Sequence, residues 1–295
     1  MSLGIGHLQA VVHVAEQGSF TRAADALHIT QPALSHRIAE AERLLRVRLF
    51  DRTRRTISMT RAGENVVEAA RRTLGAHERG MNKVYAAAGE SRSAVHVAAL
   101  PSLAAVVLPS AIRDLASLMP GTHCTVTAAD AEKVISLVRE GTCDFGLTAL
   151  DVPHPAVWSA QIHEDRFVAL LPPTHHLALE THVAWGDLVR ERFIIPPLSS
   201  SLHHILLETF NSTRQAPTDT MAGADLASTA GLVAAGLGVA VIPRLTLPLT
   251  SFADLAIREI AGPTISRSIF CMGSYDSVLD PASQSLLASV EAILS

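Results

Sequence analysis

The residues whose chemistry can be assigned most readily lie in the run HITQPALSHR, residues 28–37. Thr30 can cap a helix, and Pro32 fits the first turn, where a missing backbone N–H costs nothing. That turn then presents hydrogen-bonding groups to a partner, because Gln31 can pair with adenine at two positions and Ser35 with several base edges. The candidate DNA contacts in this helix are Thr30, Gln31, Pro32, Ser35, His36 and Arg37.

A basic turn follows in RLFDRTRRTIS, residues 48–58. Two short alternating runs flank it, which predicts a β-hairpin wing with Arg52, Arg54 and Arg55 available to phosphates or to a minor groove. Such a run met alone is more often a solvated turn. Its place directly after two short helices favours the DNA-binding interpretation.

Hydroxyl groups stand where several later helices are expected to begin, at 102, 127–130 and 199–201. Backbone N–H groups at such helix starts bind anions and suit a small carboxylate, although Ser and Thr are also simply good N-caps. No arginine can be assigned to the same site, and the charge of the ligand stays open. The end of the third expected strand, at Thr148 and Ala149, adds two further candidates. The candidate effector contacts are therefore Ser102, Thr127, Asp130, Thr148, Ala149, Ser199, Ser200 and Ser201.

Fourteen histidines raise the question of a metal site, above all the adjacent pairs at 175–176 and 203–204. Neighbouring side chains on a strand point to opposite faces, and no Cys or carboxylate stands at ligand spacing from either pair. The sequence therefore predicts neither a metal site nor a cofactor. It also lacks a nucleophile elbow, a P-loop and a dinucleotide fingerprint, so no catalytic residues are expected.

The three cysteines, Cys124, Cys143 and Cys271, lie far apart and predict no disulfide framework, which fits a reducing compartment. Cys124 and Cys143 lie in apolar strand patterns, where a thiol behaves as a small hydrophobic group.

Three short helices must position the DNA-contacting residues. Apolar residues recur at helical spacing over 7–17, and Gly18 follows where a left-handed cap is needed. Ser19 can cap a second helix over 20–27, and the third begins three residues later. Two helices joined in this way form a helix-turn-helix. The buried stripe of the third helix is predicted to consist of Leu34, Ile38, Ala41 and Leu45.

One long helix is predicted over residues 61–88. At ~1.5 Å per residue it would be about 42 Å long. So small a domain offers little to bury its apolar stripe, and pairing with a second copy of the chain is the simplest solution. The stripe consists of Val66, Ala70, Leu74, His77, Met81, Val84 and Ala88.

From Ala94 onward, short apolar strands alternate with helices. AVHVAAL, HCTVTA and CDFGLTAL, separated by helices over 102–119 and 130–140, predict βαβ units and a parallel sheet. FVALLP, RFIIP, GVAVIP and SIFCMG continue the alternation. The pattern predicts two small α/β subdomains, and the cleft between them is the default ligand site. The remaining helices are expected near 200–211, 225–236 and 281–294.

The length and composition of the chain are consistent with more than one domain. The chain has 295 residues, of which 48% are hydrophobic, enough for two or three domains. Residues 1–92 carry 14 basic and 9 acidic side chains, whereas 93–295 carry 10 and 19, so a basic head is joined to an acidic body. No apolar run reaches the roughly 18 to 20 residues that cross a bilayer, and no signal region is seen, which predicts a soluble cytoplasmic protein.

The segments SFTRAADAL at 19–27, ITQPALS at 29–35 and VRLFDRT at 47–53 closely resemble the winged helix-turn-helix signature of the LysR-type transcriptional regulators. The segment TRAG at 60–63 and the block LVAAGLGVAVIP at 232–243 fit the same family. The resemblance therefore covers essentially the whole chain, and its N-terminal part is highly specific because ordered residue types recur there at fixed spacing.

The resemblance implies an α/β fold with an N-terminal winged helix-turn-helix, a long linker helix and a C-terminal two-lobed domain similar to periplasmic binding proteins. It implies that Gln31, Pro32 and Ser35 face the DNA groove, that Arg52 and the 54–55 tip form the wing, and that inducer contacts fall at 102 and at 199–201. The implied boundaries are 1–60 for the DNA-binding domain, 61–91 for the linker, and 92–295 for the effector domain, with lobe I at about 92–163 and 268–295 and lobe II at about 164–267.

The resemblance also implies partners. The linker helix would form a dimer, dimers would pair into tetramers, and the assembly would bind double-stranded promoter DNA, a small-molecule inducer and RNA polymerase. Such proteins usually activate a neighbouring operon and often repress their own gene. Peroxide-sensing members use a reactive cysteine pair, for which Cys124 and Cys143 are the candidates here.

Three arginines depart from the family pattern. Arg46 stands where Gly is usual after the third helix, and because a left-handed non-glycine residue costs on the order of 1 to 2 kcal/mol, we expect that helix to end differently. Arg54 replaces a common Gly at the wing tip, and Arg61 replaces the Pro usual before Ala62 and Gly63. All three add positive charge near the expected DNA surface, so stronger salt dependence is expected rather than altered base choice.

A second hypothesis comes from a different class of protein. It treats the C-terminal part as a small-molecule enzyme or transport-type binding module joined to an incidental basic head. Sequence-specific operator binding without turnover would exclude it.

Overall fold

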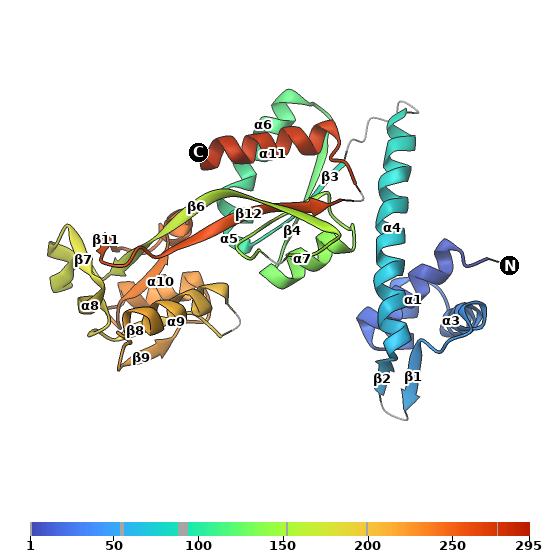
Figure 1. Ribbon diagram of the computed structural model, residues 1–295, viewed down its shortest axis with the longest axis horizontal. Coiled ribbons are helices and arrows are strands. Elements are labelled where there is room, and N and C mark those ends of the chain that lie inside the picture. The colour runs from blue at the N-terminus through green and yellow to red at the C-terminus, as the bar shows by residue number, and fades with distance from the viewer. Residues whose placement is uncertain (1, 54–55, 88–93, 152, 199, 276) are drawn as a thin grey trace.

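The computed structural model describes residues 2–53, 56–87, 94–151, 153–198, 200–275 and 277–295. Figure 1 shows a small helical head, one long helix that rises from it, and a larger α/β body. The head and the long helix comprise α1 (Ile5–Gln17), α2 (Phe20–Ala26), α3 (Gln31–Leu45), β1 (Phe50–Thr53), β2 (Thr56–Met59) and α4 (Arg61–Ala87).

Two hydroxyl groups cap the second and third helices, as the sequence predicted. Ser19 Oγ accepts a hydrogen bond from the backbone N–H of Arg22, and Thr30 Oγ1 accepts one from Ala33, both at 3.4 Å. The predicted stripe of α3 is confirmed at its centre, where Leu34, Ile38 and Ala41 are all 0% exposed, and Leu45 packs at the edge of the same core. Burial of this face leaves the opposite face of α3 for a partner.

Helix α3 ends on a left-handed residue, so the expectation that Arg46 would end it differently is wrong. Arg46 has φ 56° and ψ 31°, and its N–H donates to the carbonyl of Glu42. The N–H of Val47 donates to the same carbonyl at 3.2 Å, and the Glu42 carboxylate accepts from Leu49 N at 2.7 Å. These hydrogen bonds hold the turn in place, and they offset the strain that an arginine side chain brings there.

Replacing Arg46 by glycine should therefore stabilise the protein by about 1 kcal/mol relative to Arg46→Ala, because only glycine adopts this φ without steric cost. Urea unfolding of the two variants measures the difference, and the alanine variant accounts for loss of the guanidinium. Equal midpoints would show that the turn carries no strain.

The long helix α4 is confirmed, but its apolar stripe divides into two parts. Near its N-terminus, Ala70 of the stripe is 1% exposed and Val67, beside the stripe, is 4% exposed, because α4 packs along α1. Farther along, Val84 of the stripe and its neighbour Tyr85 are 58% and 46% exposed. Ala88, the last residue of the predicted stripe, lies outside the described residues. The expectation that the small domain buries little of this helix is thus wrong for its first turns, whereas the later apolar surface at Val84 and Tyr85 is exposed in the single chain.

The α/β body follows the long helix. Its elements are β3 (Ala94–Ala99), α5 (Pro101–Val106), α6 (Leu108–Leu118), β4 (His123–Ala128), α7 (Ala131–Arg139), β5 (Phe145–Thr148), β6 (Val157–Leu171), η1 (His176–Leu179), β7 (His182–Ala184), α8 (Trp185–Leu188), β8 (Phe193–Ile195), α9 (Ser201–Thr213), β9 (Thr220–Ala222), α10 (Leu226–Ala234), β10 (Ala240–Pro243), η2 (Arg244–Thr250), β11 (Ala256–Ala261), β12 (Ser266–Ser274) and α11 (Pro281–Leu294) within the described ranges.

The body has two main hydrophobic cores. One is formed by β3, β5, β12 and the helices α5, α6 and α11, and includes Phe145 and Leu286. The other lies around Trp185, Phe193 and Phe210, whose rings stack or meet edge to face. We call these two regions the first and the second lobe. Within the described ranges, no helix is both long and apolar enough to cross a membrane.

The main sheet is only partly parallel. Its strands run in the order β4-β3-β5-β12-β6-β11-β7, with β10 also paired to β6. The predicted βαβ units are confirmed because β3 pairs in parallel with both β4 and β5. Strand β12, however, is antiparallel to β5 and β6, and β6 is antiparallel to β10 and β11. In the second lobe, parallel pairing is found between β7 and β11 and between β8 and β9. The expected parallel sheet is therefore interrupted by antiparallel strands.

Two long strands connect the lobes. In Figure 1, β6 and β12 lie side by side and pass from one lobe into the other. They are paired from Val157 with Ser274 to Arg166 with Ser266, after which β6 continues into the second lobe against β10 and β11. The sequence predicted only the apolar end of β6, because its first half is polar and carries no strand signal of its own.

Candidate functional site

The start of α3 presents an open polar face. Gln31, Pro32, Ala33 and His36 are exposed, and Ser35 is half-buried beside the core residue Leu34. Thr30 precedes them as the N-cap. The face therefore carries a flexible amide and a hydroxyl at the end of a rigid, capped helix. Groups of this kind hydrogen-bond to base edges in a major groove.

Farther along α3, side chains hold the helix to its neighbours. The Arg37 guanidinium lies against Gly6 of α1, so only part of it is available to a phosphate. Glu40 Oε2 is 3.0 Å from His7 Nε2, and Glu40 Oε1 is 3.8 Å from Arg43 Nη2. The hydrogen bond with His7 lowers the pKa of the Glu40 carboxyl group. A carboxylate here would repel phosphates, so a polyanion would meet α3 most favourably at its first turns.

The hairpin after α3 is anchored by groups that the sequence did not reveal. Glu42 Oε1 accepts from the N–H groups of Leu49 and Phe50 at 2.7 and 3.3 Å. Thr60 Oγ1 donates to the carbonyl of Arg48 at 2.7 Å, which closes the base of the hairpin. Arg52 lies in β1 opposite Ile57. The tip residues Arg54 and Arg55 lie outside the described residues.

The first-lobe candidates for effector contacts share one edge of the sheet. Ala99 at the end of β3 pairs with Ala128 of β4, and the parallel register places the ends of β3, β4 and β5 together. Ser102, Thr127 and Asp130, and Thr148 and Ala149 therefore lie at the same carboxyl edge, where ligands bind in open α/β sheets.

Their accessibility differs. Ser102 is half-buried and Thr127 is exposed, whereas Thr148 is 0% exposed and its hydroxyl accepts from Leu150 N at 3.3 Å. Asp130 Oδ1 accepts from Lys133 N at 2.8 Å, and so it acts as the N-cap of α7. Its hydrogen bond satisfies one of the N–H groups that an anion would otherwise use, which supports the capping interpretation of this residue.

The second-lobe candidates lie at the start of α9. Ser200 is the N-cap and accepts from Leu202 N at 3.2 Å, and Ser201 is the first helical residue. Ser199 lies outside the described residues. Among the described residues, no hydrogen bond joins Ser200 or Ser201 to Ser102, so the two halves of the predicted effector set are not hydrogen-bonded to each other.

An arginine that the sequence did not assign lies next to Ser102. Arg267 Nη2 donates to Ser102 Oγ at 3.4 Å and is 2.9 Å from Asp165 Oδ2, and Nε donates to the same carboxylate oxygen at 3.0 Å. Arg267 and Asp165 are only 4% and 1% exposed. Burial lowers the pKa of the Arg267 guanidinium, and the charge of Asp165 opposes that shift.

This ion pair holds the junction between the lobes. It links β12 to β6, and Asp165 Oδ1 accepts from Leu245 N of η2 at 3.0 Å. The sequence does carry a signal that Arg267 is buried. Alternation along the strand places Arg267 on the same face as Ile269 and Cys271, which are buried. Since Asp165 already neutralises it, Arg267 positions Ser102 and is not a free anion receptor.

The head contacts the first lobe through α4. On α4, Arg71 Nη2 lies 3.2 Å from Oε1 of Glu16 in α1, and Arg71 Nη1 lies 2.7 Å from Oε1 of Glu140, which follows α7. Arg139 Nη2 is 2.9 Å from Glu68 Oε1. These charges border a cavity of about 240 Å³ between α4 and α7. The pairs between α4 and the first lobe join distant parts of the chain, and no local pattern could have predicted them.

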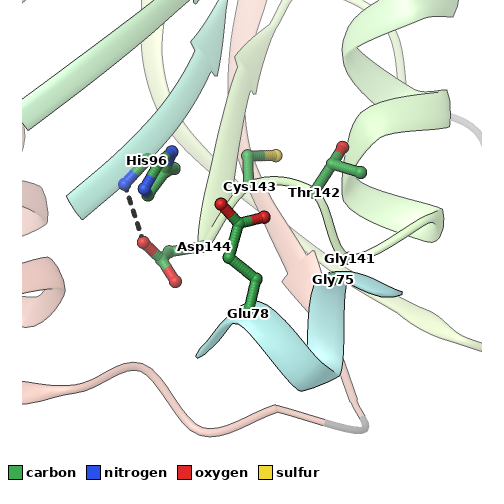
Figure 2. Close-up of a pocket in the computed structure, with 7 residues that line it drawn as sticks. All are labelled: Gly75, Glu78, His96, Gly141, Thr142, Cys143 and Asp144. Atoms are coloured by element: carbon green, nitrogen blue, oxygen red, sulfur yellow. Dashed lines mark hydrogen bonds between the residues drawn. The ribbon is translucent and has the colours of Figure 1, made fainter. Parts of the chain in front are cut away.

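A second, smaller pocket lies nearby on the same boundary. Figure 2 shows Glu78 of α4 and Asp144 of the first lobe pointing toward it beside Cys143. His96 N donates to Asp144 Oδ2 at 2.8 Å. A Cβ at Gly75 would collide with the carbonyl oxygen of Gly141, so α4 and the first lobe approach closely here.

Burial and acidic neighbours oppose thiolate formation. Burial, with a further contribution from Asp144, raises the pKa of the Cys124 thiol to about 11. Burial also raises the pKa of Cys271, with smaller contributions from Glu291 and Cys143. A redox-sensing cysteine needs a low pKa and access to solvent. These environments instead support the interpretation of Cys124 as a small apolar group.

At pH 8, Cys124 should therefore react with iodoacetamide about 100-fold more slowly in the folded protein than in urea, because a two-unit rise in pKa lowers the thiolate fraction by that factor. Mass spectrometry of the labelled Cys124 peptide measures both rates. A folded rate within a few-fold of the unfolded one would restore the redox hypothesis.

The adjacent histidines do not lie as the sequence suggested. His175 and His176 are at the start of η1 rather than on a strand, and their rings stack at 4.6 Å with both facing Glu191. The expectation of opposite faces is thus wrong for this pair. The fold also brings in a carboxylate from a later turn, that of Glu191, which sequence spacing did not indicate. His203 and His204 instead make separate contacts with the carbonyls of Pro196 and Ser200.

Comparisons with known proteins match both the helical head and the α/β body. A family model described as "Bacterial regulatory helix-turn-helix protein, lysR family" matches residues 5–64, and one described as "LysR substrate binding domain" matches 88–294. The chain is 28% identical over 285 residues to the uncharacterized HTH-type transcriptional regulator YbhD of Escherichia coli (strain K12), covering 96% of this chain and 90% of that protein.

One further relative and one solved structure are similar to this chain over nearly its whole length. A probable hydrogen peroxide-inducible genes activator of Mycobacterium avium is 27% identical, over 99% of this chain and 94% of its own length. The solved structure of CbnR, a LysR family transcriptional regulator, matches with a TM-score of 0.71 at 20% identity, covering 99% of both chains. This chain therefore belongs to the LysR family and is a DNA-binding transcriptional regulator with an effector-binding domain.

Proposed function

We propose that the protein reads a promoter through the first turns of α3 and controls a nearby operon, and its own gene, in response to a small metabolite. The observation that carries this proposal is the open, capped start of α3, where Gln31 and Ser35 stand over a fully buried Leu34. CbnR has also been solved in complex with its target DNA. The proposed DNA contacts are Thr30, Gln31, Pro32, Ser35, His36, Arg37, Arg52, Arg54 and Arg55.

The proposed effector site is the carboxyl edge of β3–β5 together with the start of α9. Ser102, Thr127 and Ser200–Ser201 offer hydroxyl groups and helix N–H groups that suit a carboxylate. The effector binding domain of BenM, solved with its effector benzoate, matches 68% of this chain with a TM-score of 0.62. Asp130, Thr148, Ala149 and Ser199 complete the proposed set. We also retain the proposed boundaries of 1–60, 61–91 and 92–295.

Assembly would connect the two sites. The exposed Val84 and Tyr85 of α4 are apolar surface that a second copy of α4 would cover, and two such dimers would form a tetramer. In this mechanism, effector binding shifts the effector domains between two arrangements. The Arg71–Glu140 and Arg139–Glu68 pairs then carry the shift to α4, change the spacing of the heads and alter DNA bending. A cytoplasmic location and a contact with RNA polymerase follow from promoter binding.

Footprinting with and without inducer tests this proposal. The inducer can be sought by thermal-shift screening of small carboxylates, because a ligand at 100 times its Kd adds about 2.7 kcal/mol. The gene transcribed divergently beside this one would suggest which pathway to screen. Footprints of identical extent and bend would contradict the mechanism, whereas turnover of a ligand without operator binding would favour an enzyme.

Neutralising Arg46, Arg54 and Arg61 together should reduce the salt dependence of operator binding without changing base preference. For every arginine that no longer neutralises a phosphate, the slope of log K against log salt becomes shallower by about 0.9. The slope is measured by fluorescence anisotropy from about 50 to 200 mM salt, with the exposed Arg113 of the body replaced as the control. An unchanged slope in the triple variant would show that these arginines do not face DNA.

A further inference from the structure

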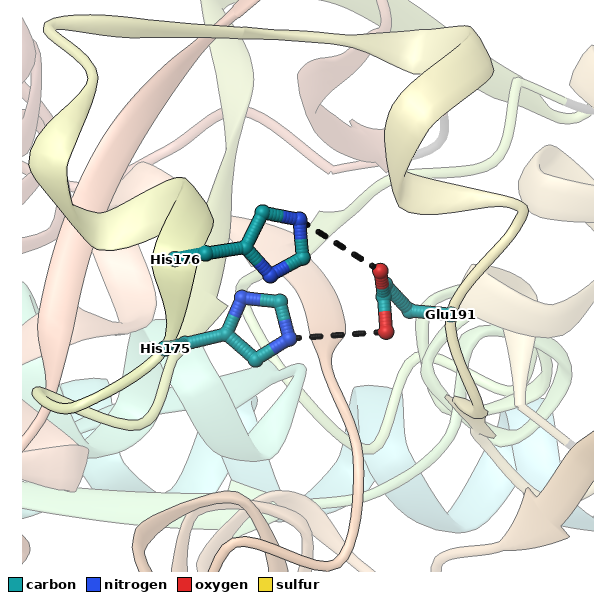
Figure 3. A group of neighbouring side chains, drawn as sticks. All are labelled: His175, His176 and Glu191. Carbon is teal, nitrogen blue, oxygen red and sulfur yellow. Dashed lines mark ion pairs between the residues drawn. The ribbon is translucent and has the colours of Figure 1, made fainter.

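Three side chains with metal-binding atoms converge on the surface of the second lobe, apart from the proposed DNA and effector contacts. Figure 3 shows His175 and His176 stacked side by side, with their rings directed at the carboxylate of Glu191. His175 Nε2 is 3.5 Å from Glu191 Oε2, and His176 Nε2 is 3.7 Å from Oε1. One ligand atom from each residue lies within 4.8 Å of the others.

The two segments that carry these residues are held by the fold. The backbone N–H of His175 donates to Pro172 O at 3.0 Å, and that of Glu191 donates to Leu188 O at 3.2 Å. Leu177, two residues after His175, and Leu188 are 6% and 0% exposed and belong to the same core. The backbone at these positions is therefore held in place before any ligand binds.

The spacing of the three groups fits a bridging cation better than direct hydrogen bonds. The two Nε2–Oε distances of 3.5 and 3.7 Å exceed the usual range of about 2.7–3.2 Å for N–H···O hydrogen bonds. Ligands at zinc bond lengths of roughly 2.0–2.1 Å in a tetrahedron lie about 3.4 Å from one another. A small movement of the exposed His176, whose side chain is 69% exposed, would reach that geometry.

We propose that His175, His176 and Glu191 bind a divalent transition cation of the zinc class, with water in the remaining coordination positions. Two imidazoles and one carboxylate suit Zn²⁺ and its neighbours in the first transition row, whereas Mg²⁺ and Ca²⁺ prefer oxygen ligands alone. Ligation through His175 Nε2 places its ring proton on Nδ1. A protonated Nδ1 cannot accept a hydrogen bond, so the 3.3 Å hydrogen bond from Leu177 N is lost when Nε2 binds the metal.

The bound cation would join two segments that are distant in sequence. It would fasten the start of η1, at His175 and His176, to the turn between α8 and β8, on the outer side of the second core. Because the folded state alone brings the three ligands together, binding stabilises it over the unfolded chain. The open coordination positions and the exposure of His176 make the ion exchangeable with solution.

The test uses the full-length protein without a histidine tag, stripped with EDTA and dialysed against Zn²⁺. We expect one Zn²⁺ per chain, no uptake of Mg²⁺, and a higher Tm with Zn²⁺. His176→Ala and Glu191→Gln should each lower the affinity by more than the roughly 10- to 100-fold that loss of a supporting hydrogen-bond partner costs. His204→Ala, which removes an exposed histidine from the other adjacent pair, is the matched control and should bind Zn²⁺ as the unaltered protein does.

Substitution by Co²⁺ provides a readout that depends on ligand identity, since its visible spectrum reports the coordination number and the donor atoms. The unaltered protein and His204→Ala should show the same spectrum, and the two ligand variants should not. Absence of Zn²⁺ binding by the unaltered protein would overturn the proposal. So would unaltered affinity in His176→Ala and Glu191→Gln, which would assign the ion to the cysteines or to other histidines.

Discussion

Replacing Arg267 by methionine is expected to lower the free energy of unfolding by about 3–5 kcal/mol, because it leaves a buried carboxylate without its partner. Asp165 is 1% exposed, and its Oδ2 lies 3.0 and 2.9 Å from Nε and Nη2 of Arg267. The pair lies where β6 and β12 pass between the lobes and where η2 attaches through Leu245. Loss of the arginine therefore weakens the connection between the lobes as well as their stability.

A double-mutant cycle separates the buried charge from simple loss of packing. Asp165→Asn keeps an acceptor for Leu245 N but removes the charge, so the double variant Asp165→Asn with Arg267→Met should cost less than the sum of the two single variants. Arg166→Met, at the exposed neighbouring position on β6, should change stability by no more than about 0.5 kcal/mol. Additive effects in urea unfolding would show that the two residues do not act as a pair.

Replacing Gln31 and Ser35 by alanine is expected to abolish most of the discrimination between a cognate promoter and random duplex. Each good hydrogen-bonding pair with a base edge is worth about 1–3 kcal/mol of discrimination, so the double variant should lose at least ~30-fold. Binding to random duplex should change little, because it depends on phosphate contacts from the arginines. Fluorescence anisotropy with both duplexes at one salt concentration measures the ratio of affinities.

The matched control for this variant is Gln9→Ala, which removes an exposed glutamine from α1. It should leave the ratio unchanged. The α3 substitutions lie outside the buried stripe of Leu34, Ile38 and Ala41, so the variants should fold with the stability of the unaltered protein. Retained discrimination in a folded double variant would mean that α3 does not read the bases, and the proposed function would then lack its main support.

Local patterns were sufficient to predict the head and much of the body. The caps at Ser19 and Thr30, the buried stripe of α3, the hairpin, the long helix and the βαβ units all depend on residues close in sequence. Capping and periodic burial act over roughly three to eight residues, so helix caps and buried faces can be predicted from one sequence alone. The left-handed Arg46 was missed because hydrogen bonds from Val47 and to Glu42 outweighed a local preference.

The tertiary structure alone decided the contacts between segments that are far apart in the chain. Arg267 meets Asp165 across 102 positions, Arg71 meets Glu140 across 69, and Glu191 reaches two histidines that local reasoning had placed on opposite faces of a strand. Each depends on how strands pair and lobes pack, and no spacing in the sequence encodes that distance. The amino acids thus determined the elements and the exposed polar face of α3, whereas only packing decided which distant charges became partners.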